Sequence, residues 1–388
     1  MPTTAPGIDR LRRSLAAAMD QRGDWPERSP WIREAVDALP RHRFAPDRVW
    51  RWDGHAYEPV DQRTDPAGWA SEVYPGPDTA TVTEVTDGLP ASSLSSQAVV
   101  VDMLDSLLLE PGHRVLELGT GSGWNTALLS RRTGPRLTVS VEASPGLAQA
   151  ARRALAAAGL TAHVEVGDGN RGWAPAAPYD RVMATYAVER IPWAWIAQTR
   201  PRGRVVTPWG RLGHIALTVA DDGRSATGWV QGLAQFMPDR AALRREPDFT
   251  QVRARSEPEG ERTFLRDLTP LQDNAHLRFA LRVALPHLRI TLAYDADGLN
   301  AWMHDTEESW AVLSAIGGGR TIATQGGPRH LADELEAAWD TWLDLGSPDL
   351  YDFGMTVTDS GATQYIWVND PAAEPRWAIT RTPMPTSD

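Results

Sequence analysis

The residues with the clearest chemical role form a glycine-rich segment, Val115-Leu-Glu-Leu-Gly-Thr-Gly-Ser-Gly-Trp-Asn-Thr-Ala127. An apolar run precedes the glycines, and a second apolar run at 137–141 leads directly into Glu142. This succession predicts a strand, a tight turn, a helix and a second strand closed by a carboxylate. Doubly wound α/β sheets bind nucleoside cofactors in this way, with the acid on the ribose hydroxyls.

The spacing of the glycines distinguishes between nucleoside cofactors. Gly119, Gly121 and Gly123 follow the pattern G-x-G-x-G, whereas dinucleotide-binding proteins use G-x-G-x-x-G to seat a pyrophosphate on a helix N-terminus. The acidic residue Glu117 precedes the first glycine. A carboxylate there would repel a pyrophosphate and tolerate a cationic sulfonium, so the pattern indicates S-adenosylmethionine.

Two further strand ends follow at the expected intervals. The segment 164–169 ends in Asp168-Gly169, and the segment 180–185 ends at Thr185. Because the carboxyl ends of parallel strands meet at one edge of the sheet, we expect Asp168 beside the cofactor, where it accepts from the adenine amino group. Glycines that only make a tight turn explain the first motif, but they do not explain the ordered set of three strand ends.

The composition excludes several other classes of protein. The chain has 388 residues, enough for two domains, with 42% hydrophobic and 23% charged residues. It lacks an apolar run of membrane-spanning length, and its first residues lack a signal peptide's apolar core, so we expect a cytoplasmic protein. The absence of cysteine and of paired histidine spacing disfavours a metal site, and the net charge of −11 disfavours nucleic-acid binding.

The periodicity along the chain predicts four parts. Helices at 7–24 and 31–39, followed by a long irregular arm, make up residues 1–90; a helix at 91–110 opens the cofactor-binding domain at 91–238. A charged linker at 239–270 leads to a smaller α+β domain at 271–388, with a helix at 331–345 and a closing hairpin at 354–368. We therefore expect a Rossmann-like α/β fold with an N-terminal helical extension and a smaller C-terminal α+β domain.

Residues 7 to about 237 resemble the protein L-isoaspartyl (D-aspartyl) O-methyltransferases. The segments that carry the resemblance are "PRHRFAP", "LSSQAVVVDML", "VLELGTGSGWNTALLS", "GDGNRGW" and "YDRVMATYAVERIP". The resemblance implies a class I methyltransferase that uses S-adenosylmethionine, releases S-adenosylhomocysteine and methylates a carboxylate. The C-terminal part, with "SWAVL", "GPRHLADELEAAW" and "FGMTVT", is more similar to methyltransferases found beside ATP-grasp peptide maturases, which act on ribosomal peptides called graspetides.

The motifs and the resemblance together define a candidate site. The cofactor-binding set comprises Glu117, Gly119, Thr120, Gly121, Gly123, Trp124, Glu142, Asp168, Gly169 and Thr185. The catalytic set comprises Ser95, with Ser93 and Ser96 in support. A carboxylate of pKa about 4 is already ionised at neutral pH and needs no general base, so a serine hydroxyl would only hold one carboxylate oxygen while the other attacks. The alternative is that one of these serines caps the following helix.

The substrate is predicted from the positions at which the chain departs from the family pattern and from the additional C-terminal domain. The repair enzymes typically read I-S-x-P where this chain reads Leu94-Ser-Ser-Gln97, which indicates a rebuilt acceptor entrance. We expect methylation of an aspartate in a ribosomal precursor peptide, whose ester closes to a succinimide (aspartimide), with the C-terminal domain recognising the precursor. Isoaspartyl repair, methylation of a small natural product, and a binding protein that only keeps the fold are the alternatives. The oligomeric state is left open.

The seventeen tryptophans offer a second clue to peptide binding. Trp is enriched at binding hot spots, and such a surface could be built by Trp302, Trp310, Trp339, Trp342 and Trp367. Core packing is the alternative, and it is favoured for the two on the helix at 331–345. In the arm, Trp50, Trp52 and Trp69 are expected over the active site.

Overall fold

A computed structural model describes residues 6–210, 212–239 and 246–379. The chain divides into two compact units, one formed by Met1–Ala241, Met355–Tyr365 and Ala378–Asp388 and the other by Ala242–Gly354 and Ile366–Trp377. The hairpin predicted at 354–368 is therefore divided between the units, and most of it belongs to the first. The predicted C-terminal domain at 271–388 is not one contiguous unit.

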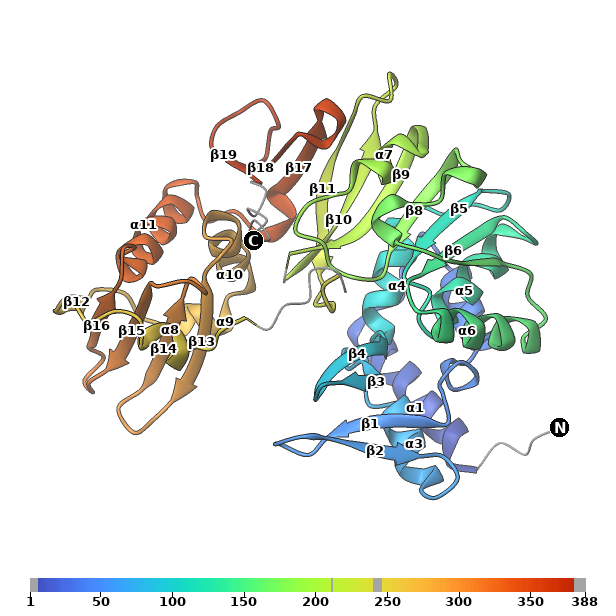
Figure 1. The fold of residues 1–388 in the computed structure, drawn as a ribbon, viewed down its shortest axis with the longest axis horizontal. Coiled ribbons are helices and arrows are strands. Elements are labelled where there is room, and N and C mark those ends of the chain that lie inside the picture. The colour runs from blue at the N-terminus through green and yellow to red at the C-terminus, as the bar shows by residue number, and fades with distance from the viewer. Residues whose placement is uncertain (1–5, 211, 240–245, 380–388) are drawn as a thin grey trace, which may run out of the picture. The chain divides into compact units, whose positions relative to one another are not determined.

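The N-terminal part of the first unit contains a helical pair, α1 (Pro6–Arg22) and α2 (Trp31–Ala38), two further helices and a small sheet. The further helices are η1 (Arg41–Arg43) and α3 (Pro66–Val73). The region expected to be irregular contains the strands β1 (Arg48–Trp52), β2 (Tyr57–Asp61), β3 (Thr81–Thr86) and β4 (Leu89–Leu94). They form an antiparallel sheet in the order β2-β1-β3-β4, and α1 and α3 lie beside it (Figure 1). The arm is thus a folded layer with its own core rather than a long loop.

The helix predicted at 91–110 is shorter than expected. Residues as far as Leu94 continue strand β4, and helix α4 covers only Gln97–Ser106. The strand forms because Leu94 pairs with Thr81 across the sheet and both side chains are buried. The serines at 95 and 96 therefore lie at a strand-to-helix junction.

A large mixed sheet has most of its residues in the first unit. Its strands are β5 (Val115–Leu118), β6 (Thr138–Glu142), β7 (His163–Val166), β8 (Tyr179–Ala184), β9 (Thr199–Trp209), β10 (Gly213–Val219), β11 (Ser225–Leu233), β17 (Phe353–Thr358), β18 (Thr363–Val368) and β19 (Arg376–Ala378), in the order β19-β18-β17-β11-β10-β9-β8-β5-β6-β7. Strands β5 to β9 are parallel, whereas β10 is antiparallel to both of its neighbours. The chain runs from β5 to β6 and β7 on one side and returns to β8 on the other, so the strand order reverses beside β5.

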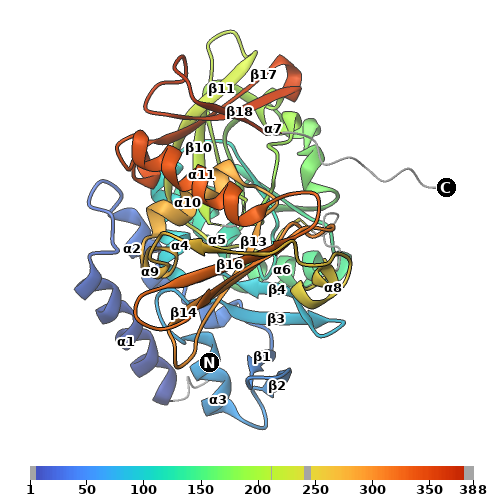
Figure 2. The ribbon, with the colours of Figure 1, turned by 90° about the vertical axis from the view of Figure 1, so that its left-hand side faces the viewer.

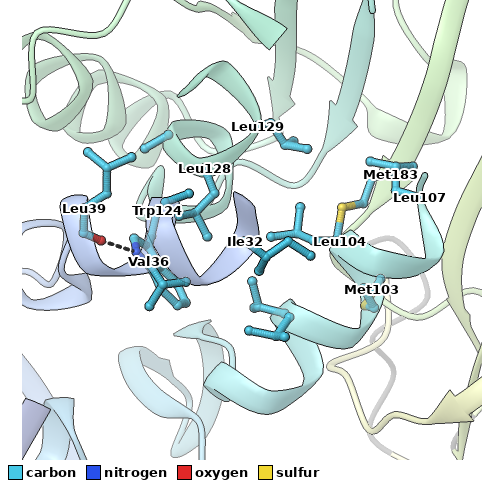
Figure 3. Packing of buried hydrophobic residues seen from close by; sticks show 14 of the residues in the cluster. Ile32, Val36, Leu39, Met103, Leu104, Leu107, Trp124, Leu128, Leu129 and Met183 are labelled. Atoms are coloured by element: carbon cyan, nitrogen blue, oxygen red, sulfur yellow. Dashed lines mark hydrogen bonds between the residues drawn. The ribbon is translucent and has the colours of Figure 1, made fainter. Parts of the chain in front are cut away.

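Helices between these strands complete the first unit. They are α5 (Trp124–Thr133), α6 (Pro145–Ala157), η2 (Gly169–Arg171), η3 (Ala174–Ala176) and α7 (Trp193–Ala197). Figure 3 shows apolar side chains of α2, α4 and α5 packed together, among them Ile32, Leu104 and Leu128. Within this cluster the Trp124 indole nitrogen donates to the Leu39 carbonyl at 2.8 Å. This contact ties the N-terminal helical pair to the helix that follows the glycine-rich turn.

The second unit is a five-stranded antiparallel sheet with helices. Its elements are α8 (Phe249–Arg253), β12 (Glu261–Phe264), α9 (Thr269–Asp273), α10 (Ala275–Ala284), β13 (Arg289–Tyr294), β14 (Leu299–His304), β15 (Trp310–Ala315), β16 (Thr321–Gly326), α11 (Leu331–Asp344) and η5 (Leu350–Asp352). The strand order is β12-β16-β15-β14-β13, and Figure 2 shows α10 and α11 side by side next to this sheet. The predicted linker at 239–270 is partly folded, because β12 pairs with β16. Trp310, Trp339, Trp342 and Trp367 are buried, so they fill cores.

Candidate active site

A cavity of about 490 Å³ opens at the carboxyl ends of β5, β6 and β8, where the strand order reverses. Ligands of doubly wound sheets bind at such a position. Its described lining comes entirely from the first unit and includes Gly119–Asn125 apart from Gly123, Glu142, Asp168, Gly169 and Thr185, together with 90–96 and 235–239. The separate strand ends noted in the sequence therefore converge on one space.

The glycine-rich turn needs glycine for two different reasons. Gly119 has φ +93°, and a Cβ there would come within 2.5 Å of the Thr185 hydroxyl. Gly121 also has positive φ, at +53°, but a Cβ there would meet only the Ser93 carbonyl at 3.9 Å. This open space beside the Gly121 backbone is a cradle in which a bound group can approach the main chain closely.

Gly123 does not line the cavity, contrary to the sequence prediction. A Cβ at this position, where φ is +88°, would meet the Ala151 Cβ at 3.2 Å. Gly123 therefore allows α5 to begin close to α6. Trp124 borders the cavity, but its indole is 2% exposed and packs in the core described above. Both residues support the turn from below.

Glu142 is held in a fixed orientation at the edge of the sheet. It ends β6, is 5% exposed and lines the cavity. Its Oε2 accepts from the Gly121 backbone N–H and its Oε1 accepts from the Ser144 backbone N–H, both at 2.9 Å. A carboxylate has about four lone-pair directions, so these bonds fix its orientation and leave acceptor capacity for two ribose hydroxyls.

The segment after β7 and the end of β8 form the opposite wall. Asp168 is exposed, and its Oδ1 accepts from the Asn170 backbone N–H at 2.9 Å, which holds the turn. The Gly169 carbonyl accepts from the Trp195 indole nitrogen at 2.9 Å. The Thr185 hydroxyl donates to the Gly119 carbonyl at 2.5 Å, so Thr185 clamps the glycine-rich turn.

Tyr186 is a cavity residue that the sequence reasoning missed. Its hydroxyl donates to Asn170 Oδ1 at 3.1 Å, and its ring lies edge-on to the Trp195 ring. Burial, with Asp239 and Asp168 nearby, raises the pKa of the Tyr186 phenol well above its usual range, so it remains a neutral donor. The side chain of Asn170 also donates to Asp239. This network ties the wall after β11 to the wall after β7.

Glu117 does not face the cavity, which corrects the sequence prediction. It is fully buried under the turn and accepts from Asn125 Nδ2 at 2.7 Å, from Ser140 Oγ at 2.6 Å and from the Thr126 hydroxyl. Burial raises the pKa of its carboxyl to about 7, although these donors favour the ionised form. Glu117 therefore lies beneath the glycine-rich turn, outside the described lining of the cavity.

Two residues connect Glu117 to the cavity. Thr120 lines it and shares a 2.5 Å hydrogen bond with Ser140, which is itself bonded to Glu117. Asn125 also lines it, and its Oδ1 is a buried acceptor with no hydrogen-bond partner among the described residues. An unpartnered buried acceptor above a buried acid fits a cationic group such as the ammonium of S-adenosylmethionine.

The three predicted catalytic serines all line the cavity. Ser93 and Ser95 are half-buried, and Ser96 is 8% exposed. Ser96 occupies the position before α4, yet its side chain makes no capping hydrogen bond to that helix. The capping alternative therefore has no support at Ser96, and all three serines border the cavity.

The lining has one sign of charge. Its charged side chains are Asp78, Glu142, Asp168 and Asp239, and none of the described lining residues is Lys, Arg or His. Asp78 is paired with Arg22. Such a lining attracts a sulfonium cofactor and leaves the charge of an acceptor carboxylate unquenched by a basic side chain.

The described residues contain neither a candidate metal site nor a candidate membrane-spanning helix. No group of three or more His, Asp or Glu side chains in 6–210, 212–239 and 246–379 is arranged to hold a metal ion. Over the same ranges, no helix has the length and apolar character needed to cross a membrane.

Comparisons with known proteins show which family the chain is similar to. The family model described as protein-L-isoaspartate(D-aspartate) O-methyltransferase (PCMT) matches residues 27–231. The chain is 35% identical over 190 residues to the protein-L-isoaspartate O-methyltransferase of Methylorubrum extorquens, covering 48% of this chain and 69% of that protein. It is 31% identical over 233 residues to protein-L-isoaspartate O-methyltransferase 1 of Archaeoglobus fulgidus, covering 60% of this chain and 94% of the relative.

A solved structure of a protein-L-isoaspartate O-methyltransferase shares the fold. It aligns with a TM-score of 0.51 at 20% identity and covers 94% of this chain and 100% of its own. The alignment therefore extends beyond the segment that the family model matches. The chain belongs to the protein-L-isoaspartate(D-aspartate) O-methyltransferase family, and it is an S-adenosylmethionine-dependent carboxyl methyltransferase of class I fold.

Proposed function

We propose that this protein transfers the methyl group of S-adenosylmethionine to the free carboxylate of an isoaspartyl residue in a polypeptide. The observation that carries the proposal is the single cavity in which Gly121 and Glu142 face Ser93 and Ser95. The matched relatives are isoaspartate O-methyltransferases, which favours this substrate over the ribosomal precursor preferred from the sequence. The extra residues that suggested a dedicated precursor are also covered by the alignment with the solved isoaspartate O-methyltransferase.

In this proposal some residues of the cavity bind the cofactor and others position the acceptor. Bound S-adenosylmethionine supplies an electrophilic methyl group on a positively charged sulfur. Glu142 would accept from the ribose hydroxyls, Asp168 would accept from the adenine amino group, and the Gly121 backbone would allow close approach. Asn125 Oδ1 would accept from the ammonium of the amino-acid moiety.

Ser95 performs the positioning on the acceptor side. Its hydroxyl would donate to one carboxylate oxygen and leave the other oxygen free to attack the methyl group that the cofactor would supply. A carboxyl of pKa about 4 is ionised at neutral pH, so no side chain removes a proton. Holding both reactants in line supplies most of the rate enhancement, since effective molarities of well-oriented groups reach about 10⁵ M or more.

The direct test compares two matched peptides. The purified protein is incubated with S-adenosylmethionine and a peptide containing either isoaspartate or aspartate at one position, and the mass is followed. We expect a gain of about 14 Da, the mass of a methylene, on the isoaspartyl peptide only. Ser95→Ala is expected to lower kcat while cofactor affinity is unchanged. Wild-type turnover by Ser95→Ala would remove Ser95 from the mechanism, and no methylation of the isoaspartyl peptide would refute the proposal.

A second candidate is methylation of an aspartate in a ribosomal precursor, followed by closure to an aspartimide. Gln97 favours it, because this residue stands where the family has proline beside the acceptor serine. Gln97 is 4% exposed, and its Nε2 lies 3.2 Å from Met19 Sδ, so this entrance is built differently. A cyclised precursor that loses about 18 Da, the mass of a water, while the isoaspartyl peptide is not methylated would select this candidate.

A further inference from the structure

The four-stranded sheet of the arm has two different faces. Val49 pairs with Val60, and both are buried in a core with Trp69, whose indole nitrogen donates to the Pro46 carbonyl. Helices α1 and α3 contribute the rest of that core. Trp69 therefore serves packing rather than the active site, contrary to the sequence prediction. The core with α1 and α3 covers this face of the sheet at Val49 and Val60.

The opposite face carries a row of apolar side chains that leads into the cavity. The register pairs Trp50 with Pro59 and with Val82, and pairs Val82 with Ser93. Directly paired residues project from the same side of a sheet, so these four side chains form one row across all four strands. Val82 and Ser93 line the cavity, which places the inner end of the row at the acceptor serines.

An aromatic pair adjoins this row. Trp52 pairs with Tyr57 two residues along the same strands, so both project from the same face. Their rings lie 4.9 Å apart, Tyr57 lines the cavity, and Trp52 is 53% exposed. We call the six residues of the row and the pair the aromatic face: Trp50, Trp52, Tyr57, Pro59, Val82 and Ser93. It is continuous from the cavity to solvent.

We propose that the aromatic face binds the polypeptide segment that flanks the acceptor residue. The inference rests on the proposed function, because that function requires a polypeptide to continue outward from the cavity. The strands lie about 4.8 Å apart, so the face runs about 14 Å from β4 to β2, and an extended chain of about five residues spans it. Aromatic rings contribute strongly to peptide binding at little conformational cost.

The charges near the site favour a peptide over an anionic ligand. The side chains at the cavity end are acidic, and Arg48 on this face is paired with Asp61 at 3.6 Å. A polyanion such as nucleic acid needs unpaired cations along its path. A peptide with apolar residues next to the acceptor presents complementary surface, and only its one carboxylate enters the acidic cavity.

The experiment varies peptide length and one aromatic residue. Isoaspartyl peptides with one or with five apolar residues on each side of the acceptor are assayed for methyl transfer. Wild-type protein is compared with Trp52→Ala, Trp52→Phe and the control Trp229→Ala, a tryptophan of β11 with 40% exposure. Binding of the labelled longer peptide is measured by fluorescence anisotropy with S-adenosylhomocysteine present, so that it does not depend on turnover.

We expect the longer peptide to have the lower KM with wild-type protein. Trp52→Ala should raise that KM about tenfold, the effect of losing one hot-spot side chain, while kcat and the KM of the short peptide stay unchanged. Trp52→Phe should restore most of the affinity, and Trp229→Ala should behave as wild type.

Other outcomes separate the two proposals. Equal KM values for both lengths, or an unchanged KM in Trp52→Ala, would overturn the aromatic face as a docking surface, while turnover of the short peptide would keep the proposed function. If the longer peptide binds in a Trp52-dependent way but neither peptide is methylated, the aromatic face would stand as a docking surface and the proposed function would be refuted. A dimer lost on Trp52→Ala in sedimentation, at unchanged KM, would assign the face to a second copy of the chain and overturn peptide docking.

Discussion

Replacing Glu117 with glutamine changes stability in a direction set by its buried charge. The side chain is fully buried, and burial raises the pKa of its carboxyl from 4.5 to about 7. The folded protein therefore holds a proton at this site that the unfolded chain releases between about pH 4.5 and pH 7. The free energy of unfolding falls as pH rises through this window, by about 3 kcal/mol for a pKa shift of this size.

Glutamine fits the same hydrogen-bond network without the charge. Its oxygen can accept from Asn125 Nδ2, and its amide can donate to the hydroxyl oxygens of Ser140 and Thr126, which also act as acceptors. Glu117→Gln is therefore expected to lack this loss of stability above pH 7. For a unit of this size 1 kcal/mol corresponds to about 2–4 °C in Tm, so the difference in Tm between variant and wild type should change by about 6–12 °C from pH 4 to pH 8.

The assay is thermal unfolding of the cofactor-free protein at several pH values. Titrating groups that do not interact with residue 117 act equally on both proteins, so the difference in Tm reports mainly on Glu117. Glu27→Gln, which changes an exposed glutamate of the same unit, is the control and should show a constant difference. Parallel Tm curves for wild type and Glu117→Gln would refute the raised pKa.

The same variant links this charge to cofactor binding. A cationic ligand above Glu117 favours its ionised form, so the ligand and the proton compete. We expect wild-type affinity for S-adenosylmethionine to rise between pH 6 and pH 8, and the affinity of Glu117→Gln to stay nearly flat. Isothermal titration at each pH measures both. Identical pH profiles would show that the cavity does not sense this carboxylate.

Other changes probe the cofactor wall and the sheet. Glu142→Ala or Asp168→Ala should weaken S-adenosylmethionine binding by roughly tenfold or more in isothermal titration, as expected for loss of one or two hydrogen bonds to charged groups, and unchanged affinity would mean that the adenosine is misplaced. Gly119→Ala should abolish cofactor binding and lower Tm, because its Cβ overlaps the Thr185 hydroxyl; wild-type affinity would show that the turn can relax. Deleting 240–388 should lower the Tm of the first unit, because β17 no longer covers the edge of β11, and an unchanged Tm would make that pairing dispensable.

Local sequence patterns were sufficient to predict that the residues at the strand ends lie together at one edge of the sheet. Gly121, Glu142 and Asp168 each follow an apolar run, and parallel strands bring their carboxyl ends together regardless of the remaining fold. The inward turn of Glu117 was not predictable in this way. Its direction depends on Asn125, Ser140 and Thr126, which come from two other elements, and only the packed structure shows that they converge on the carboxylate.

Long-range pairing explains the other differences. The arm reads as irregular because its strands are short and two of them contain Pro. They become a sheet only by pairing with one another and packing on α1 and α3. The hairpin at 354–368 was recognised, but its membership in the first unit depends on β17 pairing with β11, far away in the chain. Tyr186 had no local signal, since a single aromatic residue after a strand is compatible with many environments.

The charge of the cavity explains how a carboxylate can react there without a basic partner. A Lys or Arg bound to the acceptor would stabilise its negative charge and reduce its nucleophilicity, and none of the described lining residues is of that kind. The hydroxyls of Ser93 and Ser95 can orient the carboxylate while leaving one oxygen free to attack. In the proposed function the attraction for the acceptor would come from the cofactor sulfonium, and an acidic lining would favour binding of that cation before the anion. Methyl transfer would remove both charges, so the ester would lose the attraction of the sulfonium and the acidic lining would lose its attraction for the cofactor, and the aromatic face would then be left to retain or release the peptide.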